Sequence, residues 1–280
     1  MKMKFIVKKA DNDITVGFFL SKNNVSKRLI TKLKRFEKGI TKNGEHCRTI
    51  DLVKEGDIVE ISIADEKRLE PNSELCVPVI YENDGFVVFD KPPFMPVHPS
   101  IKHQGDTLGN FFSARYPDLT FRPVNRLDRD TSGLCVVAKN SFFATALQFS
   151  TEKTYFAIVE GKISQSGTID LPIAREKESI ITRIVSPDGQ PAVTHYKPIK
   201  SDGKHTLLEI SLETGRTHQI RVHFSHIGHP LVGDDLYGEK SGLISRQALH
   251  CGRLEITLPD GEKLTVSSSL PNDMKNIITI

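Results

Sequence analysis

The sequence has few cysteines and no long apolar run. Its 280 residues include four cysteines, which are Cys47, Cys76, Cys135 and Cys251. Their spacing predicts neither a disulfide framework nor a Cys-x-x-Cys zinc half-site. No apolar stretch approaches the roughly 20 residues of a membrane-spanning helix, and the N-terminus lacks the apolar core of a signal peptide. We therefore expect a cytoplasmic protein with no membrane partner.

The overall composition is ordinary, but the charge is unevenly distributed. Hydrophobic residues make up 38% of the chain and charged residues 26%, which is typical of a globular protein. The net charge is only +3, yet residues 22–48 carry nine Lys or Arg against Glu37 and Glu45, a local net of +7. Positive charge confined to one segment indicates a polyanion-binding surface.

This basic segment has the pattern of a small α+β unit. Residues 25–38 form an amphipathic helix pattern, with Ser26 as a predicted N-cap and Gly39 as a predicted stop. Asn43-Gly44 is a hairpin signal, and residues 58–63 alternate as a strand does. A basic helix by itself is more often a solvated surface, but the hairpin and strand that follow it favour a binding module.

A second, larger unit follows a polar segment. Residues 64–78 are polar, contain two prolines and predict a linker. We place a small domain at 1–70, with its core at about 20–63, and a second domain at 71–280. The second domain contains one predicted helix, at 141–150, capped by Asn140 or Ser141. It contains short predicted strands at 86–90, 134–138, 155–159, 206–212, 220–224, 254–258 and 264–267. The fold class predicted is α+β, with a mixed, mostly antiparallel sheet.

The stretch NRLDRDTSG places charges directly before a predicted buried strand. If it is extended, Arg126 and Asp128 leave on one face while Leu127 enters the core. A carboxylate held there beside a guanidinium group could act as a nucleophile. The alternative is an ordinary Asx-turn in a solvated loop, which is how we interpret Arg129 and Asp130.

The stretch ETGRTHQIRVH carries a second set of polar residues. In an extended segment, Arg221 and His223 share the face opposite the neighbouring aliphatic residues, and Arg221 requires an anion. A structural ion pair explains Arg221 equally well. The histidines of HFSHIGH suggest a metal site, but Gly228 and Pro230 break the helix that such spacing needs, so we favour polar loop histidines.

Two further stretches carry single residues of interest. Strand 86–90 runs into a proline-rich loop, KPPFMPVHP, that ends in His98; it is either a preformed binding loop or a rigid connection. Tyr155 begins an apolar strand and is either a tyrosine at the edge of the core or a base-stacking residue.

In combination, these stretches resemble a known family. NRLDRDTSG, KTYFAIVEG, ETGRTHQIRVH, GHPLVGDDLYG and ALHCGRLEITLPDG, preceded by VVFDKPPFMPVHPS, are similar to the RluA-type pseudouridine synthases of ribosomal and transfer RNA. That resemblance covers about Val79 to Leu270. Over about 45 residues, SKNNVSKRLITKLKRFEKGITKNG and EGDIVEI resemble the RNA-binding module named after a ribosomal small-subunit protein, here called the S-four-like module.

The resemblance implies roles for individual residues. Asp128 would be the catalytic aspartate, Tyr155 would stack on the target base and assist proton transfer at carbon five, and Arg221 would pair with Asp128. Arg126 would hold the displaced nucleotide. The other residues expected to contact RNA are Lys27, Arg28, Lys34, Arg35, Lys38, Arg216, His218 and His98. Similar enzymes use no metal or organic cofactor, so neither is expected.

Two positions depart from the family pattern. The family usually has His before Arg-Leu-Asp, where this chain has Asn125, and often has Gly after Lys-Pro-Pro, where this chain has Phe94. Asn125 can still form a hydrogen bond to the backbone. Phe94 affects the geometry of its loop, not the chemistry.

The expected activity is isomerisation of specific uridines in structured RNA, with large-subunit ribosomal RNA favoured. The target would be flipped out and its glycosidic bond cut and re-formed through carbon. The alternatives are a tRNA-directed synthase, a non-catalytic RNA-binding or ribosome-assembly protein on the same fold, and, less favoured, a metallohydrolase. We expect a monomer with RNA as its partner and no DNA.

Overall fold

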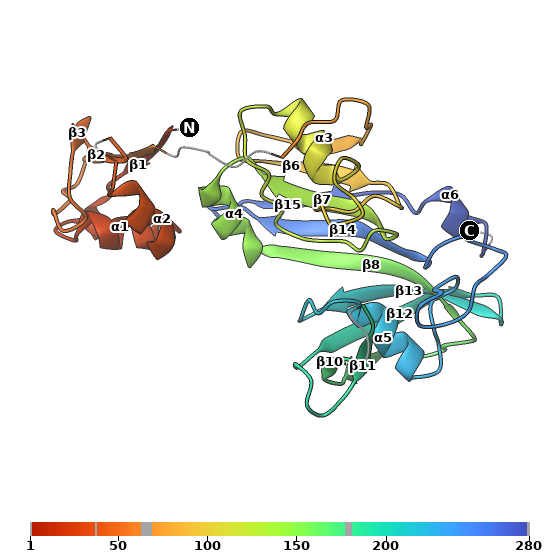
Figure 1. The fold of residues 1–280 in the computed structure, drawn as a ribbon. Helices are drawn as coiled ribbons and strands as arrows, with labels where there is room; N and C mark the ends of the chain where they lie inside the picture. Colours follow the sequence, from red (N-terminus) through yellow and green to blue (C-terminus); the bar gives the residue numbers. More distant parts are fainter. Residues whose placement is uncertain (1, 37, 63–68, 177–180, 279–280) are drawn as a thin grey trace.

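Two main β-sheets organise the chain, as the computed structural model shows over residues 2–36, 38–62, 69–176 and 181–278 (Figure 1). The smaller sheet belongs to the N-terminal region and the larger one to the rest of the chain. A two-stranded sheet, β10 (Ile173–Arg175) with β11 (Arg183–Val185), lies beside the larger one. The predicted α+β class, with a mixed and mostly antiparallel sheet, is confirmed.

The smaller sheet has four antiparallel strands in the order β1-β4-β2-β3. The strands are β1 (Lys2–Ile6), β2 (Ile40–Lys42), β3 (Glu45–His46) and β4 (Ile58–Ser62). The turn between β2 and β3 is the predicted Asn43-Gly44 hairpin. Both residues have positive φ, at 54° and 87°, as a type I′ turn requires. Two helices, α1 (Val16–Lys22) and α2 (Lys27–Leu33), complete this unit, together with a short 3-10 turn at Lys9–Asp11.

Helix α2 is shorter than the predicted 25–38. Its N-cap is Ser26, as predicted, with the side chain accepting a hydrogen bond from the Leu29 amide at 3.2 Å. The helix ends at Leu33, however, and Gly39 is not its stop. A Cβ on Gly39 would lie 2.0 Å from the Leu33 carbonyl oxygen, so this glycine permits the chain to fold back against the helix end. Helix α1 and strand β1 were not predicted.

The larger sheet has nine strands in the order β5-β6-β7-β14-β8-β13-β12-β9, with β15 paired to β14. Among the described strands of this sheet, β7 and β14 pair in parallel and the other pairs are antiparallel. The strands are β5 (Val79–Glu82), β6 (Phe86–Lys91), β7 (Ser132–Ala138), β8 (Thr151–Glu160), β9 (Gly167–Asp170), β12 (Val193–Ser201), β13 (His205–Leu212), β14 (Leu249–Thr257) and β15 (Lys263–Ser267). Six of the seven strands predicted for this unit lie in this sheet.

The seventh predicted strand, 220–224, is wrong. These residues lie in helix α5 (Gln219–His226). Ile220 and Phe224, four residues apart, both enter the main core, while Val222 packs into a separate small cluster. Arg221 and His223 alternate with the apolar residues, which is the period of a strand, but both are buried in the helix together with Ile220 and Val222. The helix brings Arg221 to the site in a different way from the one predicted.

Three other helices accompany the larger sheet: α3 (Leu108–Arg115), α4 (Ser141–Gln148) and α6 (Asn272–Lys275). Helix α4 is the predicted helix 141–150, and its N-cap is Asn140, whose side chain accepts from the Phe143 amide at 3.0 Å. Helix α3 was not predicted. Among the described residues, none of the helices is both long enough and apolar enough to span a membrane.

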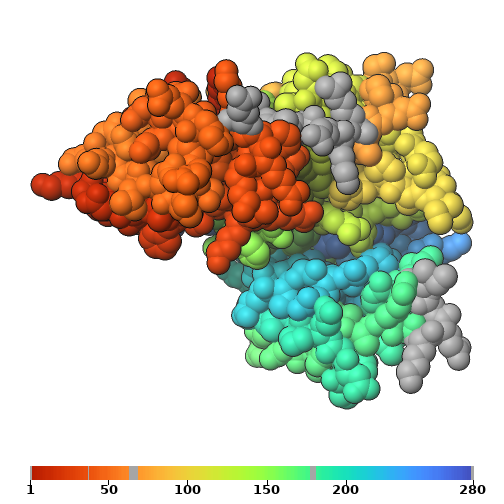
Figure 2. All heavy atoms as spheres, turned by 60° about the vertical axis from the view of Figure 1, so that its left-hand side comes forward, coloured from red at the N-terminus to blue at the C-terminus, as the bar shows by residue number. Residues whose placement is uncertain are grey.

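The described part of the predicted linker lacks regular structure. Residues 63–68 lie outside the described residues. From Leu69 onward the chain packs on the larger unit, since Leu69 touches the main core and the Asn110 side chain donates to the Glu70 carbonyl at 2.7 Å. The N-terminal unit adjoins the larger unit (Figure 2). The two are in contact at α4, whose Phe142 side chain belongs to the core of the N-terminal unit.

Candidate active site

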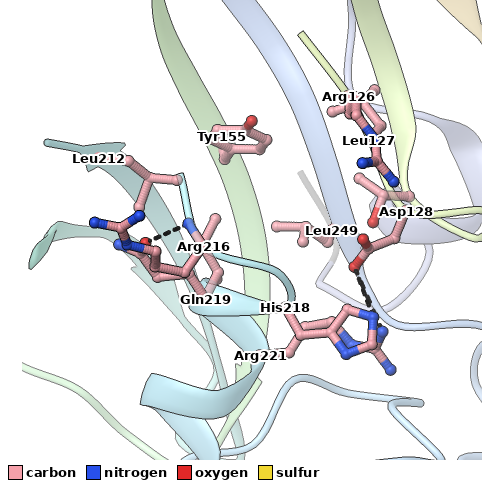
Figure 3. Close-up of a pocket in the computed structure, with 12 residues that line it drawn as sticks. Arg126, Leu127, Asp128, Tyr155, Leu212, Arg216, His218, Gln219, Arg221 and Leu249 are labelled. Atoms are coloured by element: carbon pink, nitrogen blue, oxygen red, sulfur yellow. Dashed lines mark hydrogen bonds and ion pairs between the residues drawn. The ribbon is translucent and has the colours of Figure 1, made fainter. Parts of the chain in front are cut away.

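A small polar cavity lies where the loop before β7 meets β8, β13, β14 and the start of α5. Its volume is about 70 Å³. Six residues predicted to be functional line it together, although they are up to 95 positions apart: Arg126, Asp128, Tyr155, Arg216, His218 and Arg221 (Figure 3). Apolar and neutral side chains complete the wall: Leu127, Thr131, Leu212, Gln219, Ile220 and Leu249.

The loop that carries Asp128 is anchored on both sides. As predicted, Leu127 is buried while Arg126 and Asp128 face the cavity. The loop turns back at once, with the Thr131 amide donating to the Asp128 carbonyl at 3.1 Å. Gly133 then lets β7 pass close to β14, because a Cβ there would lie 2.3 Å from the Cys251 carbonyl oxygen and its φ is 114°. The carboxylate therefore sits at a fixed place beside the middle of the sheet.

Asn125 secures the other side of this loop. Its side-chain amide donates to the Leu134 carbonyl at 3.1 Å, and its side-chain oxygen accepts from the Val136 amide at 2.8 Å. Both partners belong to β7, so a side chain replaces two rungs of a sheet ladder. The prediction that Asn125 bonds to the backbone is confirmed.

Arg221 contacts two carboxylates. Its Nε and Nη2 atoms donate to Asp234 at 2.7 Å each, and its Nη1 reaches Asp128 at 3.5 Å. Asp234 is fully buried and also accepts from the amides of Leu236 and Tyr237. Burial opposes the charged form of Arg221, but the bonds to Asp234 outweigh it and raise the pKa of the guanidinium. A permanent positive charge thus lies next to Asp128.

His218 also lies close to Asp128, beside Arg221. Its Nε2 lies 3.8 Å from the Asp128 carboxylate, and its Nδ1 pairs with the Tyr237 hydroxyl at 2.8 Å. The Arg221 guanidinium lies over the Tyr237 ring, 5.0 Å from its centroid. The pKa of His218 is lowered, mainly by burial. The charge of Asp128 opposes this effect, and the charge of Arg221 adds to it. The imidazole is therefore neutral at pH 7.

The backbone at His218 is strained, and the next residue holds it in place. His218 has φ 58° and ψ 19°, a left-handed conformation, and it is the N-cap of α5. The Gln219 side chain accepts from the Arg216 amide at 2.9 Å and donates to the Val193 carbonyl at 3.0 Å. These bonds fix the loop that presents both Arg216 and His218 to the cavity.

Tyr155 forms the opposite wall from Asp128. Its side chain is 7% exposed on β8 and belongs to the main core, yet it lines the cavity (Figure 3). Burial, followed by the nearby Cys251 and Asp128, raises the pKa of Tyr155 well above its ordinary value. The phenol thus stays protonated at neutral pH, and its ring offers a flat apolar surface of the kind on which bases stack.

The proline-rich loop after β6 is joined to the Asp128 loop by Lys91. The fully buried ammonium donates to the carbonyls of Pro92, Met95 and Arg129 at 2.8–3.0 Å. Burial lowers the pKa of Lys91 to about 8. In the same loop, Phe94 has φ 65°, a conformation that favours glycine, and its ring is 50% exposed.

The remaining predicted RNA contacts do not line this cavity. His98 is exposed at the end of the proline-rich loop, with its ring 5.3 Å from that of Phe121. The basic residues on or just after α2 are all exposed: Lys27, Arg28, Lys34, Arg35 and Lys38. Arg129 and Asp130 pair with each other at 2.7 Å and stay outside the cavity, as predicted for a solvated loop.

Two of the three histidines of HFSHIGH are bonded within the fold. His223 bonds to the Thr194 hydroxyl and the Leu171 carbonyl, and His229 bonds to the Glu160 carbonyl. The described part of the chain contains no group of three His, Cys, Asp or Glu side chains placed to hold a metal ion.

Sequence reasoning missed three residues of this site: Asp234, Tyr237 and Lys91. The first two lie in GHPLVGDDLYG, where two acids and a tyrosine follow a turn, but nothing in that stretch shows that the first acid is buried against Arg221. Lys91 directly follows a buried strand, which is an unusual place for a lysine and the one signal that could have identified it.

Comparisons with known proteins identify the family of the chain. The family model described as RNA pseudouridylate synthase matches residues 85–226. The chain is 38% identical to a Bacillus subtilis protein named as the uncharacterised RNA pseudouridine synthase YjbO, over 95% of this chain and 98% of that one. It is 37% identical to the ribosomal large subunit pseudouridine synthase D of Xanthomonas campestris, covering 85% of this chain and 79% of that one. The structure of human RNA pseudouridylate synthase domain containing 1 matches with a TM-score of 0.60 and 28% identity, covering 72% of this chain and 86% of that one.

Proposed function

The chain belongs to the RluA family of RNA pseudouridine synthases, and we propose that its substrate is large-subunit ribosomal RNA. The similarity to relatives named as ribosomal large subunit pseudouridine synthase D supports this target. The basic N-terminal unit supports it further, since it resembles a module of ribosomal origin. A ribosomal RNA substrate also implies a cytoplasmic location.

We infer that Asp128 is the catalytic aspartate. Pseudouridine forms when the bond from N1 of uracil to C1′ of the ribose breaks, the base turns, and C5 bonds to C1′ while N1 gains the proton that C5 loses. Attack on the base, attack on the sugar and assistance to glycal formation all require an ionised carboxylate. The single observation that carries this role is the position of Asp128 in the cavity, 3.5 Å from Arg221 and opposite Tyr155.

The other residues of the cavity position the substrate in this proposal. Uridine must leave its stack to enter so small a site, at a cost of roughly a few kcal/mol. The Tyr155 ring offers a stacking surface to the flipped base, which offsets part of that cost. Arg126 and Arg216 are exposed at the cavity and would bind the phosphates on either side of the target. The exposed Lys and Arg side chains on and just after α2 would bind more distant phosphates.

A direct assay tests both the reaction and its target. Purified protein is incubated with transcribed large-subunit ribosomal RNA that carries tritium at carbon five of uridine. Tritium release is expected with the wild type and no release with Asp128→Asn. Asp130→Asn, two residues away and paired with Arg129 on the surface, is the matched control and should remain active. Release from Asp128→Asn at the wild-type rate would refute its role. Tritium release from a tRNA transcript but not from ribosomal RNA would show that the substrate is tRNA.

A further inference from the structure

A second cavity lies between the N-terminal unit and the larger unit. It has a volume of about 270 Å³, nearly four times that of the site around Asp128. Helix α2 and the residues after it form one wall, and Arg122 with the first two turns of α4 forms the other. None of the residues that line it belongs to the Asp128 site.

The chemistry of this interdomain cavity matches a nucleotide. Its apolar surface comes from Leu29, Leu33 and Phe36 on one side and Ala144 on the other, and the Phe36 ring is 43% exposed. Its charged lining residues, among those described, are all cationic: Arg28, Lys32 and Arg122. A flat apolar base and an anionic phosphate would each meet a complementary surface here.

A polar group in the wall is also unpartnered. Ser141 lines the cavity, and its hydroxyl oxygen is buried without a hydrogen-bond partner. Buried hydroxyl groups are normally satisfied, so this one has hydrogen-bonding capacity to spare at the wall of the cavity. The exocyclic oxygens and ring nitrogens of nucleobases supply both donors and acceptors for such a group.

One short segment of the chain connects the cavity to the Asp128 site. Residues 122–126 run beside β7, with the Ala138 amide donating to the Arg122 carbonyl and the Val124 amide to the Val136 carbonyl, both at 2.8 Å. Arg122 lines the interdomain cavity and Arg126 lines the Asp128 site. The two cavities are thus connected through one short segment, in which the backbone bends at Val124 and Asn125.

Aromatic packing holds the two walls together. The Phe142 ring lies 5.7 Å from Phe5 of β1 and 5.4 Å from Phe143, and Phe143 in turn lies 6.2 Å from Phe86 of β6. This chain of rings connects the core of the N-terminal unit to the main core. The cavity beside it therefore has preformed walls, which reduces the cost of ordering on binding.

We propose that this interdomain cavity binds the base of an unpaired RNA nucleotide that lies outside the Asp128 site. The base stacks against Phe36, and the adjoining phosphates bind Arg28, Lys32 and Arg122. The inference rests on RNA as the substrate but not on which RNA is modified. The N-terminal unit would then position the RNA strand relative to the Asp128 site, in addition to attracting its phosphates.

Binding of a defined oligonucleotide tests the proposal. The probe is a fluorescein-labelled 12-nucleotide oligouridylate, measured by fluorescence anisotropy at several salt concentrations with the full-length protein. Ala144→Phe fills the cavity and Phe36→Ala removes the stacking ring. Each variant should raise Kd about tenfold, within the range for loss of one stacked base, without changing the salt slope. Arg122→Gln should raise Kd and also reduce the salt slope by about 1.

Matched variants and a second probe separate stacking from damage to the fold. Ala146→Phe lies on the same helix outside the cavity, and Phe149→Ala removes a ring that is 90% exposed at the end of α4, so both should bind as the wild type does. A 12-nucleotide probe with abasic riboses keeps every phosphate but offers no base. On this probe, Ala144→Phe and Phe36→Ala should equal the wild type.

The possible results distinguish this proposal from the proposed target. Three results would overturn the proposal for the interdomain cavity. They are wild-type affinity for oligouridylate in both cavity variants, an equal loss of affinity on the abasic probe, and no binding of oligouridylate by the wild type. Tritium release from ribosomal RNA is measured on the same preparations. Cavity variants should show a raised KM with kcat unchanged, because Asp128 is untouched. Absence of release with the wild type would refute the ribosomal target while leaving the binding result intact.

Discussion

The guanidinium of Arg221 makes its two short hydrogen bonds, at 2.7 Å each, to Asp234, whereas its contact with Asp128 is 3.5 Å. Asp234 therefore fixes the orientation of the arginine, and the remaining edge of the guanidinium faces Asp128. Because Asp234 holds Arg221 in place, the guanidinium can stabilise the charge of Asp128 without forming a short hydrogen bond to it.

Asp234→Asn should damage both stability and activity. It leaves the buried charge of Arg221 without its main partner, which typically costs about 3–5 kcal/mol. We expect a lower urea midpoint and strongly reduced tritium release. Asp235→Asn changes the neighbouring exposed carboxylate and is the control. If the two variants unfold at the same urea concentration, Asp234 does not anchor Arg221.

Tyr155 offers a test of its ring and its hydroxyl separately. Tyr155→Phe keeps the flat surface, so KM should hold, while loss of the hydroxyl should lower kcat by about 10²-fold or more if that group takes part in proton transfer at carbon five. Tyr155→Leu removes the flat surface too and should also raise KM. Steady-state kinetics on one RNA transcript measure both constants, with Tyr81→Phe as the control. An unchanged kcat in Tyr155→Phe would limit Tyr155 to stacking.

His218 should act through Asp128, with Tyr237 holding it in place. His218→Asn tolerates the left-handed backbone but cannot reach Asp128, so we expect kcat to fall about tenfold, the value of one modest charge-assisted contact. Tyr237→Phe keeps the ring under Arg221 but removes the partner of the His218 Nδ1. Tyr237→Phe should therefore lower kcat by part of that factor. In the double variant, kcat should fall by less than the product of the two single factors. Fully multiplicative effects would show that the two side chains act independently.

Lys91 predicts a specific dependence of stability on pH. Its pKa falls from about 10.4 in an unfolded chain to about 8 when buried. Between these values the unfolded state binds more protons, so the free energy of unfolding rises with pH. Relative to Lys91→Met, the wild type should gain about 2 kcal/mol between pH 8 and pH 10. Urea denaturation at both pH values measures this gain, with Lys102→Met, an exposed lysine, as control. A constant difference would contradict the lowered pKa.

Asn125 should be required for the position of the Asp128 loop. Asn125→Ala leaves the buried Val136 amide and Leu134 carbonyl unpaired, which costs about 2–4 kcal/mol for two such groups. Asn125→Asp keeps the acceptor for Val136 and should lose less. The family residue, introduced as Asn125→His, should retain activity if one backbone bond is enough. Urea denaturation and tritium release on the three variants rank these effects, and equal stability of all three would contradict the double bridge.

The sequence predicted most of the sheet and the polar residues of the site. Strands such as 134–138 were predicted because buried strands are continuous apolar runs, and the Asn43-Gly44 turn because its conformation needs those residue types. Helix α5 was mistaken for a strand because Arg221 and His223 alternate with apolar residues, a period of two that here arises from polar side chains buried in a helix. Helix α3 was missed because no local pattern reveals its packing, whereas Lys91 was missed although a lysine directly after a buried strand is a signal.

By itself, the sequence determined the family, the fold class and the set of polar residues grouped around Asp128, since these depend on motifs and on period. Only the tertiary structure decided how those residues are paired. It shows that Arg221 is held by Asp234, that His218 is held by Tyr237, and that a cavity lies between α2 and α4. Distances between side chains far apart in sequence depend on how the whole chain packs, and no local pattern records them.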